Sequence, residues 1–521
     1  METILEQARS VPVQARAGVL VVGAGVSGLA AAVSAARAGA STILIERTAL
    51  FGGVATSGLM ASTTNHLFDG TGRQVVKGFA DEFLDRMAAA GGVSPQYKAP
   101  QVPQIPHDPE IFQLVADEML EQAGVQVILQ CAFSAPVMQG EKVTGAIVEI
   151  ASGRAAILSA VTVDCTGNAD VAARAGAPMR AVERSGVSLE FRMGNVNLHE
   201  TYLFFKQHPD EYPLLTDIAS TFDDFERNWL ERGIFHIPHG GGAKMRFVQE
   251  KIAAREFSSR SGSAHGLDHF GMYALRGTDT VMVNANFFDI DPIDAQAVSQ
   301  AHREARKRCV EVACFLSKHV PGFQRAFIAA TAPEIGVRMS RCIEGEYTLT
   351  THERDTGVRF DDVVGMGSEV IRSVRPPDPF DIPDRILFPG TRPVGQDLAS
   401  CRGDSGPPVG QSASPPTGGR IASCPGDSPS PVGQELVSCP KRVDALLVGG
   451  AKTVSTERPG LIRGQVHGMT LGQAAGVAAA LCAQSGTEPR SLDVRALQQA
   501  LLKQGTYLGD ENRLRSLGLS A

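Results

Sequence analysis

The sequence lacks both a strong excess of positive charge and a long hydrophobic run. Its 521 residues include 49 Lys and Arg against 56 Asp and Glu, which gives a formal net charge of −7. A basic surface for nucleic-acid binding is therefore not expected. Because no run of 18 or more apolar residues occurs, we expect no membrane-spanning helix. The first 18 residues contain acids and no apolar core, unlike a secretory signal.

Paired cysteines are also missing. The nine cysteines are an odd number, and none forms a Cys-x-x-Cys pair or a ferredoxin-type cluster. Cys165, Cys309, Cys314 and Cys482 lie in apolar or helix-like surroundings, which is typical of reduced thiols. The cytoplasm is the simplest location for such a chain, and we predict no metal site.

What the sequence does contain is a βαβ pattern near its start. An apolar, β-branched run at 18–22 predicts a buried parallel strand, and Gly-Ala-Gly-Val-Ser-Gly follows directly at 23–28. An alanine-rich helix is expected over 27–38, with a second strand over 42–46. The whole unit takes about 30 residues, as in dinucleotide-binding folds.

Each glycine of this motif has a separate physical role. Gly23 permits a tight turn, Gly25 lets the backbone approach a pyrophosphate, and Gly28 lets the helix pack closely on the strand. The free N–H groups of the helix N-terminus then face the phosphates. Glu46 ends the second strand, where its carboxylate can accept ribose hydrogen bonds and repel a 2′-phosphate. An isolated motif could be a mere tight turn, but strand, glycines, helix and acid together predict a dinucleotide.

The next residues distinguish FAD from NAD. The segment from Arg47 places two glycines, Gly52 and Gly53, just after the ribose acid. An NAD domain needs no such close backbone approach there, whereas an FAD domain continues along the pyrophosphate and ribityl chain. We therefore predict FAD. We expect it to be bound noncovalently, because the Val-Ala-Thr-Ser-Gly after Gly53 contains no histidine.

Three further segments carry motifs: 163–178 (VDCTGNADVAARAGAP), 331–341 (TAPEIGVRMSR), and 444–450 (DALLVGG) followed by GQAAG at 472–476. With the first motif, they resemble the FAD-dependent oxidoreductases related to the fumarate reductase and succinate dehydrogenase flavoproteins. More narrowly, they are similar to a bacterial family with ERxxxLGGxAT, DATGDGDVAARAGAP, APxIGVRExR and GQAAG segments. The resemblance covers about 17–390 and 440–507, and the motifs occur in the family's order.

The motifs and the resemblance together imply the cofactor-binding residues. These are Gly23, Gly25, Val26, Ser27, Gly28, Glu46, Arg47, Gly52, Gly53, Ala55, Thr56, Phe133, Cys165, Thr166, Gly167, Gly449, Gly450, Gly472, Gln473, Ala474 and Ala475. Two positions depart from the family. Asn168 stands where an acid is usual, and the closing strand ends in Gly-Gly-Ala-Lys452 where related flavoproteins carry Gly-Asp. Contact with FAD there would have to come from backbone N–H groups.

The predicted fold is α/β, with a discontinuous Rossmann-type FAD-binding domain of the glutathione-reductase-like kind over 17–180 and 440–521. Strand 445–449 should return to the first sheet. A helix starting near Gly472 should point its positive N-terminus at the flavin; a closely packed small-residue helix is the alternative. Since His239-Gly-Gly-Gly242 follows no strand, we predict no second dinucleotide domain for NAD(P)H.

An α+β substrate-capping domain is predicted over 181–389, inserted into the FAD-binding domain. Strands are expected at 191–193 and 281–286, a helix over 223–233, and a long amphipathic helix over 293–319. Residues 1–16 are predicted to form a flexible tail.

Residues 390–439 differ in kind from the rest. Pro-Val-Gly-Gln occurs at 393, 408 and 431 within a Pro-, Gly- and Ser-rich repeat that has too few apolar residues to offset ordering entropy. We expect a disordered insertion at a surface turn. The repeat contains Cys401, Cys424 and Cys439. Their presence is accounted for by duplication of the repeat unit, and a metal site is the alternative. Deletion of 392–438 should leave the flavin content intact.

Five residues are candidates for contact with substrate. His66 follows the Gly52-Gly53 turn, Arg338 and Arg341 lie three apart, and Arg463 and His467 precede the GQAAG segment. Flavoenzymes commonly need a proton-transfer group and cations that hold a polar or anionic substrate. We expect Arg463 to orient an electron-rich substrate and His467 or His66 to transfer the proton. Replacing His467 with Ala should then slow flavin reduction while FAD stays bound.

Each candidate also has a structural alternative. His66 could be a structural or surface histidine. If their segment is helical, Arg338 could pair with Glu334 and Arg341 with Glu344.

The predicted function is two-electron oxidation or reduction of a small organic substrate by an FAD-dependent enzyme. One alternative is a non-redox hydratase or isomerase that uses reduced FAD, and another is a non-enzymatic redox sensor or electron-carrier subunit. A small molecule is the only partner that we expect, with homo-oligomerisation left open. Neither the substrate nor the electron acceptor follows from the sequence, because this scaffold serves many chemistries.

Overall fold

The computed structural model describes residues 4–100, 102–213, 221–257, 267–285, 287–369, 379–390 and 442–519. The disorder predicted for the repeat at 390–439, and its three cysteines, concern residues outside these ranges, apart from Gly390.

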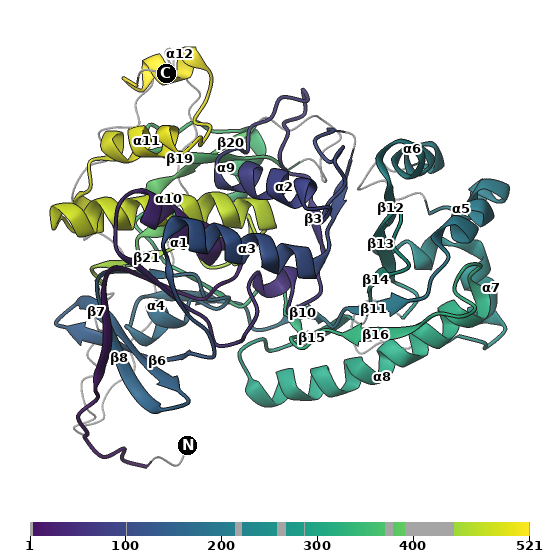
Figure 1. Cartoon of the computed structure of the whole chain (residues 1–521), viewed down its shortest axis with the longest axis horizontal. Helices are drawn as coiled ribbons and strands as arrows, with labels where there is room; N and C mark the ends of the chain where they lie inside the picture. The colour runs from purple at the N-terminus through teal and green to yellow at the C-terminus, as the bar shows by residue number, and fades with distance from the viewer. Residues whose placement is uncertain are drawn as a thin grey trace, which may run out of the picture.

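A mixed sheet forms the first half of the molecule (Figure 1). Within the described residues its strands follow the order β5 (Gln126–Ile128), β2 (Thr42–Ile45), β1 (Val13–Val22), β8 (Gly153–Asp164), β7 (Lys142–Ile150) and β6 (Ala132–Gln139). The closing strand β21 (Leu446–Val448) pairs parallel with the end of β8, so the C-terminal segment returns to the first sheet as predicted. Strands β5, β2, β1, β8 and β21 are parallel neighbours, whereas β8, β7 and β6 form an antiparallel meander.

Helices α1 (Val26–Arg37), α10 (Gln465–Ser485) and α3 (Pro109–Ala123) pack together beside the parallel strands (Figure 1). Small residues let α1 and α10 approach closely. A Cβ on Gly472 would lie 2.0 Å from the Ser27 carbonyl oxygen, and one on Gly476 would lie 2.2 Å from that of Ala31. Both helices therefore present small residues one turn apart, and the GQAAG segment is explained by helix packing.

The N-terminal tail is shorter than predicted. Strand β1 begins at Val13 instead of residue 18, because its first residues pair with β8, where Val13 aligns with Ala156. Residues 13–16 therefore belong to the sheet, and the predicted tail over 1–16 is wrong at its C-terminal end.

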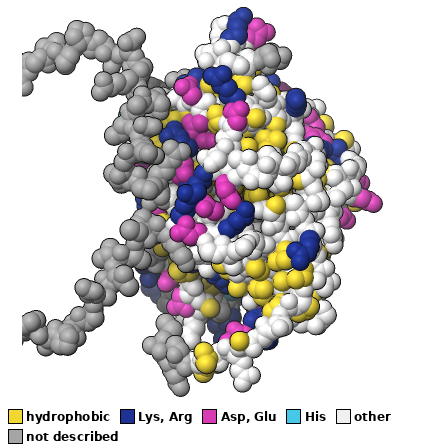
Figure 2. Space-filling model, turned by 90° about the vertical axis from the view of Figure 1, so that its left-hand side faces the viewer, with side chains coloured by type: hydrophobic (Ala, Val, Ile, Leu, Met, Phe, Trp, Pro, Cys, Tyr) yellow, Lys and Arg dark blue, Asp and Glu magenta, His cyan; other side chains and the backbone are white. Residues whose placement is uncertain are grey.

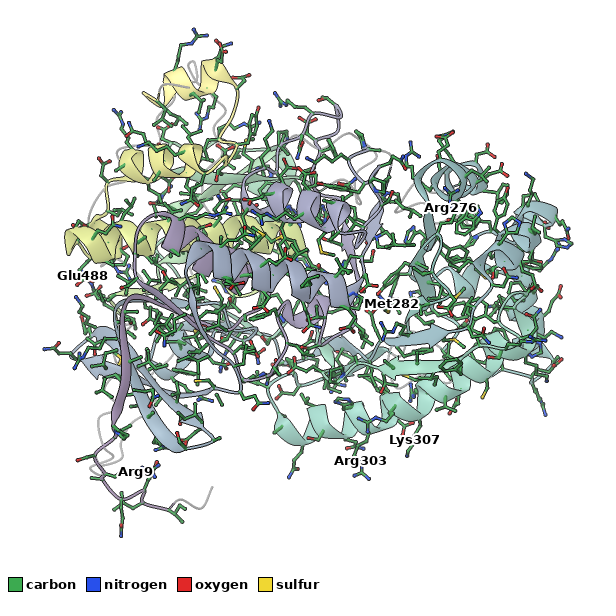
Figure 3. The ribbon with its side chains drawn as sticks, viewed as in Figure 1. Arg9, Arg276, Met282, Arg303, Lys307 and Glu488 are labelled. Carbon is green, nitrogen blue, oxygen red and sulfur yellow. The ribbon has the colours of Figure 1, made fainter. Side chains whose placement is uncertain are left out.

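A second, antiparallel sheet forms the other half of the molecule. Its order is β12 (Ile234–Ile237), β13 (Gly271–Leu275), β14 (Val281–Asn284), β11 (Phe191–Gly194) and β16 (Phe327–Thr331). Beside it lies a sheet of β15 (Phe287–Ile290), β10 (Ser185–Ser188) and β17 (Gly336–Val337). The long helix α8 (Ala295–His319) runs beneath these strands, with α5 (Leu198–Gln207), α6 (Phe222–Arg232) and α7 (Arg246–Ala253) at the far end (Figure 1). Arg303 and Lys307 project from the outer face of α8 (Figure 3), as its amphipathic pattern predicts.

Each half has its own hydrophobic core, and the boundary between them differs from the prediction. Most of the buried apolar residues between Val187 and Ala332 form the second core, together with Leu59. The apolar residues from Ile343 to Phe388, which were assigned to the capping domain, pack instead in the first core. They belong to β18 (Arg341–Ile343), α9 (Thr351–Thr356), β19 (Val363–Gly367) and β20 (Phe380–Pro383). Strand β19 contacts α10, which explains this assignment.

The remaining elements complete the first half. They are β3 (Ser62–Thr64), paired with β4 (Gln104–Pro106), β9 (Met179–Ala181), paired with β18, and helices α2 (Phe79–Ala89), α4 (Asp170–Arg174), α11 (Val494–Lys503) and α12 (Glu511–Ser516). Lys and Arg side chains are interspersed with Asp and Glu on the face that Figure 2 shows. This face therefore presents no field of a single sign.

Candidate active site

The first cavity lies at the carboxyl ends of β1, β2 and β8 and has a volume of about 500 Å³. Open α/β sheets bind nucleotides at this edge. Two glycine turns meet here, because the Gly52 N–H donates to the Ala24 carbonyl oxygen at 2.8 Å. A Cβ on Gly53 would lie 3.2 Å from the Cα of Gly25, so a side chain there would push the turns apart.

The three glycines of the first turn have different surroundings. Gly23 has a φ of +96°, and a Cβ there would meet the Cys165 carbonyl oxygen at 3.0 Å. A Cβ on Gly28 would lie only 1.8 Å from the Gly23 carbonyl oxygen, so α1 starts directly against the turn. By contrast, a Cβ on Gly25 would meet nothing within 4 Å, and Gly25 lines the cavity. Its backbone is therefore open to a ligand.

Glu46 lies at the end of β2 and lines the same cavity. Its Oε2 accepts a hydrogen bond from the Ala24 N–H at 2.8 Å, and its Oε1 accepts from the Thr48 N–H at 2.9 Å. These bonds fix the carboxylate next to the first glycine turn.

Most of the predicted cofactor residues surround this cavity. Those that line it are Gly23, Gly25, Val26, Ser27, Glu46, Arg47, Gly52, Gly53, Phe133, Cys165, Thr166, Gly167 and Gly450. Those outside its lining are Gly28, Ala55, Thr56, Gly449, Gly472, Gln473, Ala474 and Ala475. Ala55 and Thr56 face inward instead. The Ala55 carbonyl oxygen accepts from His107 Nε2 at 3.1 Å, and the Thr56 hydroxyl donates to the Phe51 carbonyl oxygen.

The predicted start of the flavin-facing helix is wrong by about two turns. Helix α10 begins at Gln465 with Gly464 as its N-cap, so Gly472 to Ala475 lie in its interior. Gln473 accepts a hydrogen bond from the Phe79 N–H at 3.0 Å, which holds it against α2. It is Gly464 and Gln465, at the helix N-terminus, that border the cavity.

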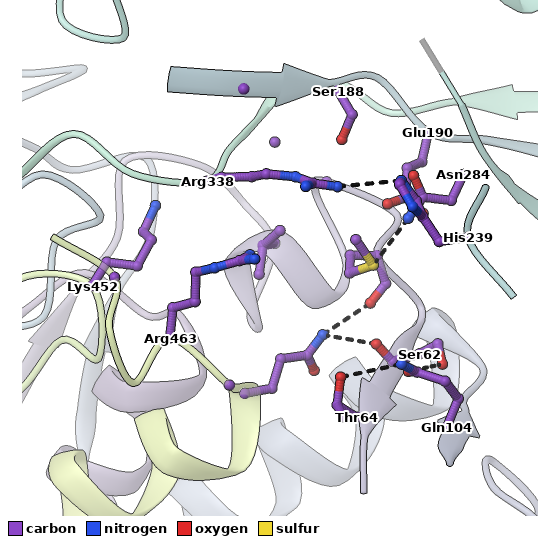
Figure 4. Close-up of a pocket in the computed structure, with 18 of the residues that line it drawn as sticks. Ser62, Thr64, Gln104, Ser188, Glu190, His239, Asn284, Arg338, Lys452 and Arg463 are labelled. Atoms are coloured by element: carbon purple, nitrogen blue, oxygen red, sulfur yellow. Dashed lines mark hydrogen bonds between the residues drawn. The ribbon is translucent and has the colours of Figure 1, made fainter. Parts of the chain in front are cut away.

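A second cavity of about 560 Å³ adjoins the first. The residues that line both are Val54, Gly58, Gly336, Val337, Lys452, Arg463, Gly464 and Gln465. Figure 4 shows how the two halves of the molecule enclose the second cavity. Ser188, Glu190 and Asn284 reach it from the second sheet and its neighbouring strands, opposite Ser62 and Thr64 of β3.

Among the described residues, five cationic side chains line the second cavity: Arg338, Arg354, Lys452, Arg458 and Arg463. Arg338 donates to His239 Nε2 at 3.3 Å, and burial lowers its pKa, although the nearby Glu190 opposes this shift. The Lys452 ammonium donates to the Val337 carbonyl oxygen at 2.9 Å. Its pKa is lowered to about 8, first by burial and then by the charge of Arg463. The positive charge of these side chains favours the binding of an anionic or electron-rich ligand.

The two histidine candidates lie together, but only one of them reaches the cavity. His66 lines it, and His467 is fully buried behind, with the two rings stacked at 4.7 Å between centroids. The Ser368 N–H donates to His467 Nε2 at 3.4 Å. Burial, followed by the proximity of His66, lowers the pKa of His467 to about 3. His467 is therefore a neutral residue that packs against His66, and its predicted direct contact with substrate is not found.

Arg341 lies outside the second cavity. Its Nη2 forms an ion pair with Asp170 at 2.9 Å, and its Nε donates to the Asn168 carbonyl oxygen at 2.5 Å. The segment is extended in β17 and β18, so the alternative helical pairs with Glu334 and Glu344 do not form. Glu334 pairs instead with Arg47 at 2.5 Å. Arg341 holds the loop after β8 in place, which corrects its predicted role at the substrate.

A carboxyl–phenol pair in the second cavity was not among the residues predicted from the sequence. Glu190 and Tyr273 line the second cavity, and the Tyr273 hydroxyl donates a hydrogen bond to Glu190. Burial is the main cause that raises the pKa of Glu190 to about 8. A signal for Glu190 was available, because an acid between the apolar Leu189 and Phe191 is unusual in a buried segment. Tyr273 had none, because its partner lies 83 positions away.

The fold and the first cavity define a dinucleotide-binding flavoenzyme. A parallel sheet carries two glycine turns at its carboxyl edge, Gly25 leaves an open cradle that a Cβ would occupy, and Glu46 is fixed beside it. These residues fit FAD. The model of the FAD dependent oxidoreductase family matches residues 18–389 and 438–501, and the chain belongs to this family. The protein is accordingly an enzyme whose cofactor is FAD.

Comparison with curated proteins finds no match. Among solved structures, the chain is similar to a geranylgeranyl bacteriochlorophyll reductase-like protein from Thermoplasma acidophilum, with 14% identity over 62% of this chain and 66% of that one and a TM-score of 0.34. It is also similar to a p-nitrophenol 4-monooxygenase from Pseudomonas putida DLL-E4, with 12% identity over 64% and 70% and the same TM-score of 0.34. The aligned region is thus about two thirds of each relative, and likeness at this level does not indicate a substrate.

Two further features bear on the predicted class. Among the described residues, α10 alone is long and apolar enough to cross a membrane, but 89% of its most apolar window is buried within the protein. It thus has the burial of a core helix, packed against α1. In the same part of the chain, no three His, Cys, Asp or Glu side chains are grouped so as to hold a metal ion.

Proposed function

We propose that the enzyme carries out two-electron oxidation or reduction of a small organic substrate that bears an anionic group and occupies the second cavity. The observation that carries this proposal is the 560 Å³ cavity that adjoins the cofactor cavity and is lined by five cationic side chains, among them the half-buried Arg338 and Lys452. A polar pocket next to a flavin site is the expected place for the substrate of a flavoenzyme.

The first cavity would hold FAD noncovalently. Gly25 and the N-terminus of α1 would face the pyrophosphate, and Glu46 the ribose. Bound FAD supplies hydride transfer, which the protein's own side chains cannot perform. Gly464 at the start of α10 and the Lys452 ammonium would provide positive charge beside a reduced, anionic ring.

The residues of the second cavity would bind and orient the substrate. Arg338 and Arg463 would pair with its anionic group, which a guanidinium can do through two parallel hydrogen bonds. The second sheet would act as the cap, because strands β10 and β13 close the cavity opposite β3 and would exclude water. His467 would position His66 through the stacked rings. All six cysteines of the described residues are free thiols, which supports a reducing compartment such as the cytoplasm.

An anaerobic visible spectrum tests this function. Purified holoenzyme is mixed with 2-hydroxy acids, 2-amino acids and saturated dicarboxylic acids, each of which combines an anionic group with a C–H bond to be oxidised. The photoreduced enzyme is then mixed with unsaturated dicarboxylic acids. We expect one class to bleach or restore the flavin bands. The proposal fails if none does so while dithionite reduces the flavin normally.

A further inference from the structure

A carboxyl and a phenol face each other deep in the second cavity. Glu190 directly precedes β11 and is 1% exposed, and Tyr273 lies in β13 and is 5% exposed. Ala332 donates its N–H to the Glu190 carbonyl oxygen at 2.9 Å, which fixes the backbone below the carboxyl. An ionisable group at this depth costs folding free energy that an apolar side chain of similar volume would avoid. The pair is therefore poorly explained by packing alone.

The phenol can form a hydrogen bond with the carboxyl in either of its protonation states. The Tyr273 hydroxyl can donate to the Glu190 carboxylate, and it also lies 3.3 Å from the Leu59 carbonyl oxygen. When Glu190 is protonated, its O–H can donate to the phenol oxygen while the phenol donates to Leu59. No polar atom of the pair then loses its partner, so a proton can arrive or leave without leaving a buried donor or acceptor unpaired.

The groups that face Glu190 also favour exchange of a proton near neutral pH. Tyr273 approaches from β13 and Arg338 from the segment after β17, whereas His236 of β12 and His239 of its C-terminal loop line the same cavity. Burial raises the pKa of Glu190 to about 8, against the opposing effects of the Tyr273 hydrogen bond and the Arg338 charge. Proton transfer is most efficient when the pKa of the catalytic group lies near the working pH.

We propose that Glu190 is the residue that exchanges a proton with the substrate, and that Tyr273 is a positioning residue that holds its carboxyl. This inference rests on the proposed function and replaces the earlier expectation that a histidine transfers the proton. In the oxidative direction the substrate loses a proton to the Glu190 carboxylate and a hydride to FAD, so both electrons leave with the hydride. In the reductive direction the Glu190 acid returns the proton and is left as the carboxylate.

The variants Glu190→Gln and Tyr273→Phe test the pair, with Tyr202→Phe and Glu226→Gln as matched controls. Tyr202 donates to Glu226 at 2.7 Å, and this pair belongs to the same half of the molecule but lies outside both cavities. The ratio of FAD to protein is measured first and should equal that of the wild type in all four variants. If Glu190→Gln loses FAD, Glu190→Asp, which keeps the carboxyl, replaces it.

A measurement without substrate examines the carboxyl directly. Infrared difference spectra of the holoenzyme between about pH 5 and pH 10 should show a carboxylic-acid C=O band that disappears as the pH rises through about 8. The band should be absent from Glu190→Gln and should titrate at a different pH in Tyr273→Phe. A spectrum identical in the wild type and Glu190→Gln at every pH would overturn the inference.

The kinetic measurement uses whichever acid of the panel reduces the wild-type flavin. Glu190→Gln should slow flavin reduction by about 10²- to 10⁴-fold, the usual size of a general acid–base contribution. The wild-type rate of substrate oxidation should rise with pH through about 8, because the carboxylate is the base, and this rise should be lost in Glu190→Gln. Tyr273→Phe should move the pH profile, whereas the controls should leave it unchanged.

The outcomes separate the inference from the proposed function. If no acid of the panel reacts with the wild-type enzyme, the proposed function fails and the inference falls with it. If an acid reduces the wild type and Glu190→Gln equally fast across the pH range, the inference alone is wrong.

Discussion

The two cavities are neighbours, yet they are built in different ways. The first is made mainly of backbone at strand ends, where Gly23, Gly25, Gly52 and Gly53 bring chain segments close together. The second is made of charged and polar side chains, such as Arg338 and Glu190, that come from both halves of the molecule. A site for a common cofactor can thus be formed by local turns, whereas a site for a particular substrate depends on how distant elements are packed.

The largest expected effect lies in the second cavity. Replacing Arg338 with Met removes a half-buried cation from beside Glu190. It should lower the kcat/KM of the reductive half-reaction by about 100-fold, since truncation of one partner of a desolvated charge pair costs about 2–5 kcal/mol. FAD content should not change. The same substitution at Arg303, on the outer face of α8, is the control. Equal kinetics of the two variants, measured by anaerobic stopped flow, would remove Arg338 from the substrate site.

A smaller effect is expected at the first cavity. Glu46→Gln keeps the shape of the side chain but removes the charge that accepts hydrogen bonds from Ala24 and Thr48. Hydrogen bonds to charged groups contribute about 1.5–3 kcal/mol, so the Kd for FAD should rise about 10- to 100-fold. Fluorescence titration of the apoprotein measures it, with the surface variant Glu149→Gln alongside. If the variant binds FAD as tightly as the wild type, Glu46 has no part in holding the ribose.

The packing of α1 against α10 can be changed by a substitution at a residue that lines neither cavity. Gly472→Ala places a methyl group 2.0 Å from the Ser27 carbonyl oxygen and forces α1 and α10 apart. The free energy of unfolding should fall by about 1–3 kcal/mol, as is typical of overpacking. Urea unfolding is the measurement, with Ser485→Ala at the exposed end of α10 as the control. A destabilisation no larger than that of the control would show that the two helices tolerate a wider spacing.

The smallest effect is expected from the repeat. The Arg490 guanidinium donates to the carbonyl oxygen of Pro389 and, at 3.4 Å, to that of Val443. Residues on the two sides of the repeat are therefore held close together by one side chain. Replacing 391–441 with a short Gly-Ser linker should therefore leave FAD content and the unfolding midpoint unchanged, since short loops span such gaps at little entropic cost. Absorbance and a thermal melt measure both quantities. A colourless product would show that the insertion supports the cofactor site.

How far the sequence could predict the structure depended on whether the relevant residues are close along the chain. Helix α1, strand β2, the return of β21 and the course of α8 were all predicted to within two residues. Strand β1, however, begins five residues before its predicted start. The start of α10 was missed, because Gly464 and Gln465 carry no strong helix signal and the small residues of GQAAG resembled a turn-bordering motif. The predicted end of the capping domain at 389 was wrong, because the pattern of apolar residues in a segment does not show which of two cores the segment joins.

The candidate substrate residues show the same limit. Arg338, Arg463 and His66 do line the second cavity, whereas Arg341 pairs with Asp170 and His467 packs behind His66. In an extended segment neighbouring side chains point to opposite faces, and residues three apart, such as Arg338 and Arg341, do the same. The sequence could therefore place both arginines near the site but could not tell which one faces it.

The cofactor class of this protein follows from residues that are close together along the chain. A nucleotide turn is local, because strand, glycines, helix and acid follow one another within about 30 residues and the backbone supplies the contacts. Which side chains line the second cavity depends instead on the tertiary structure. Glu190 and Tyr273 are 83 positions apart and become partners through the pairing of β11, β14 and β13, which no local pattern records. Their low exposure, and with it the shifted pKa of Glu190, exists only once both halves of the molecule have packed around them.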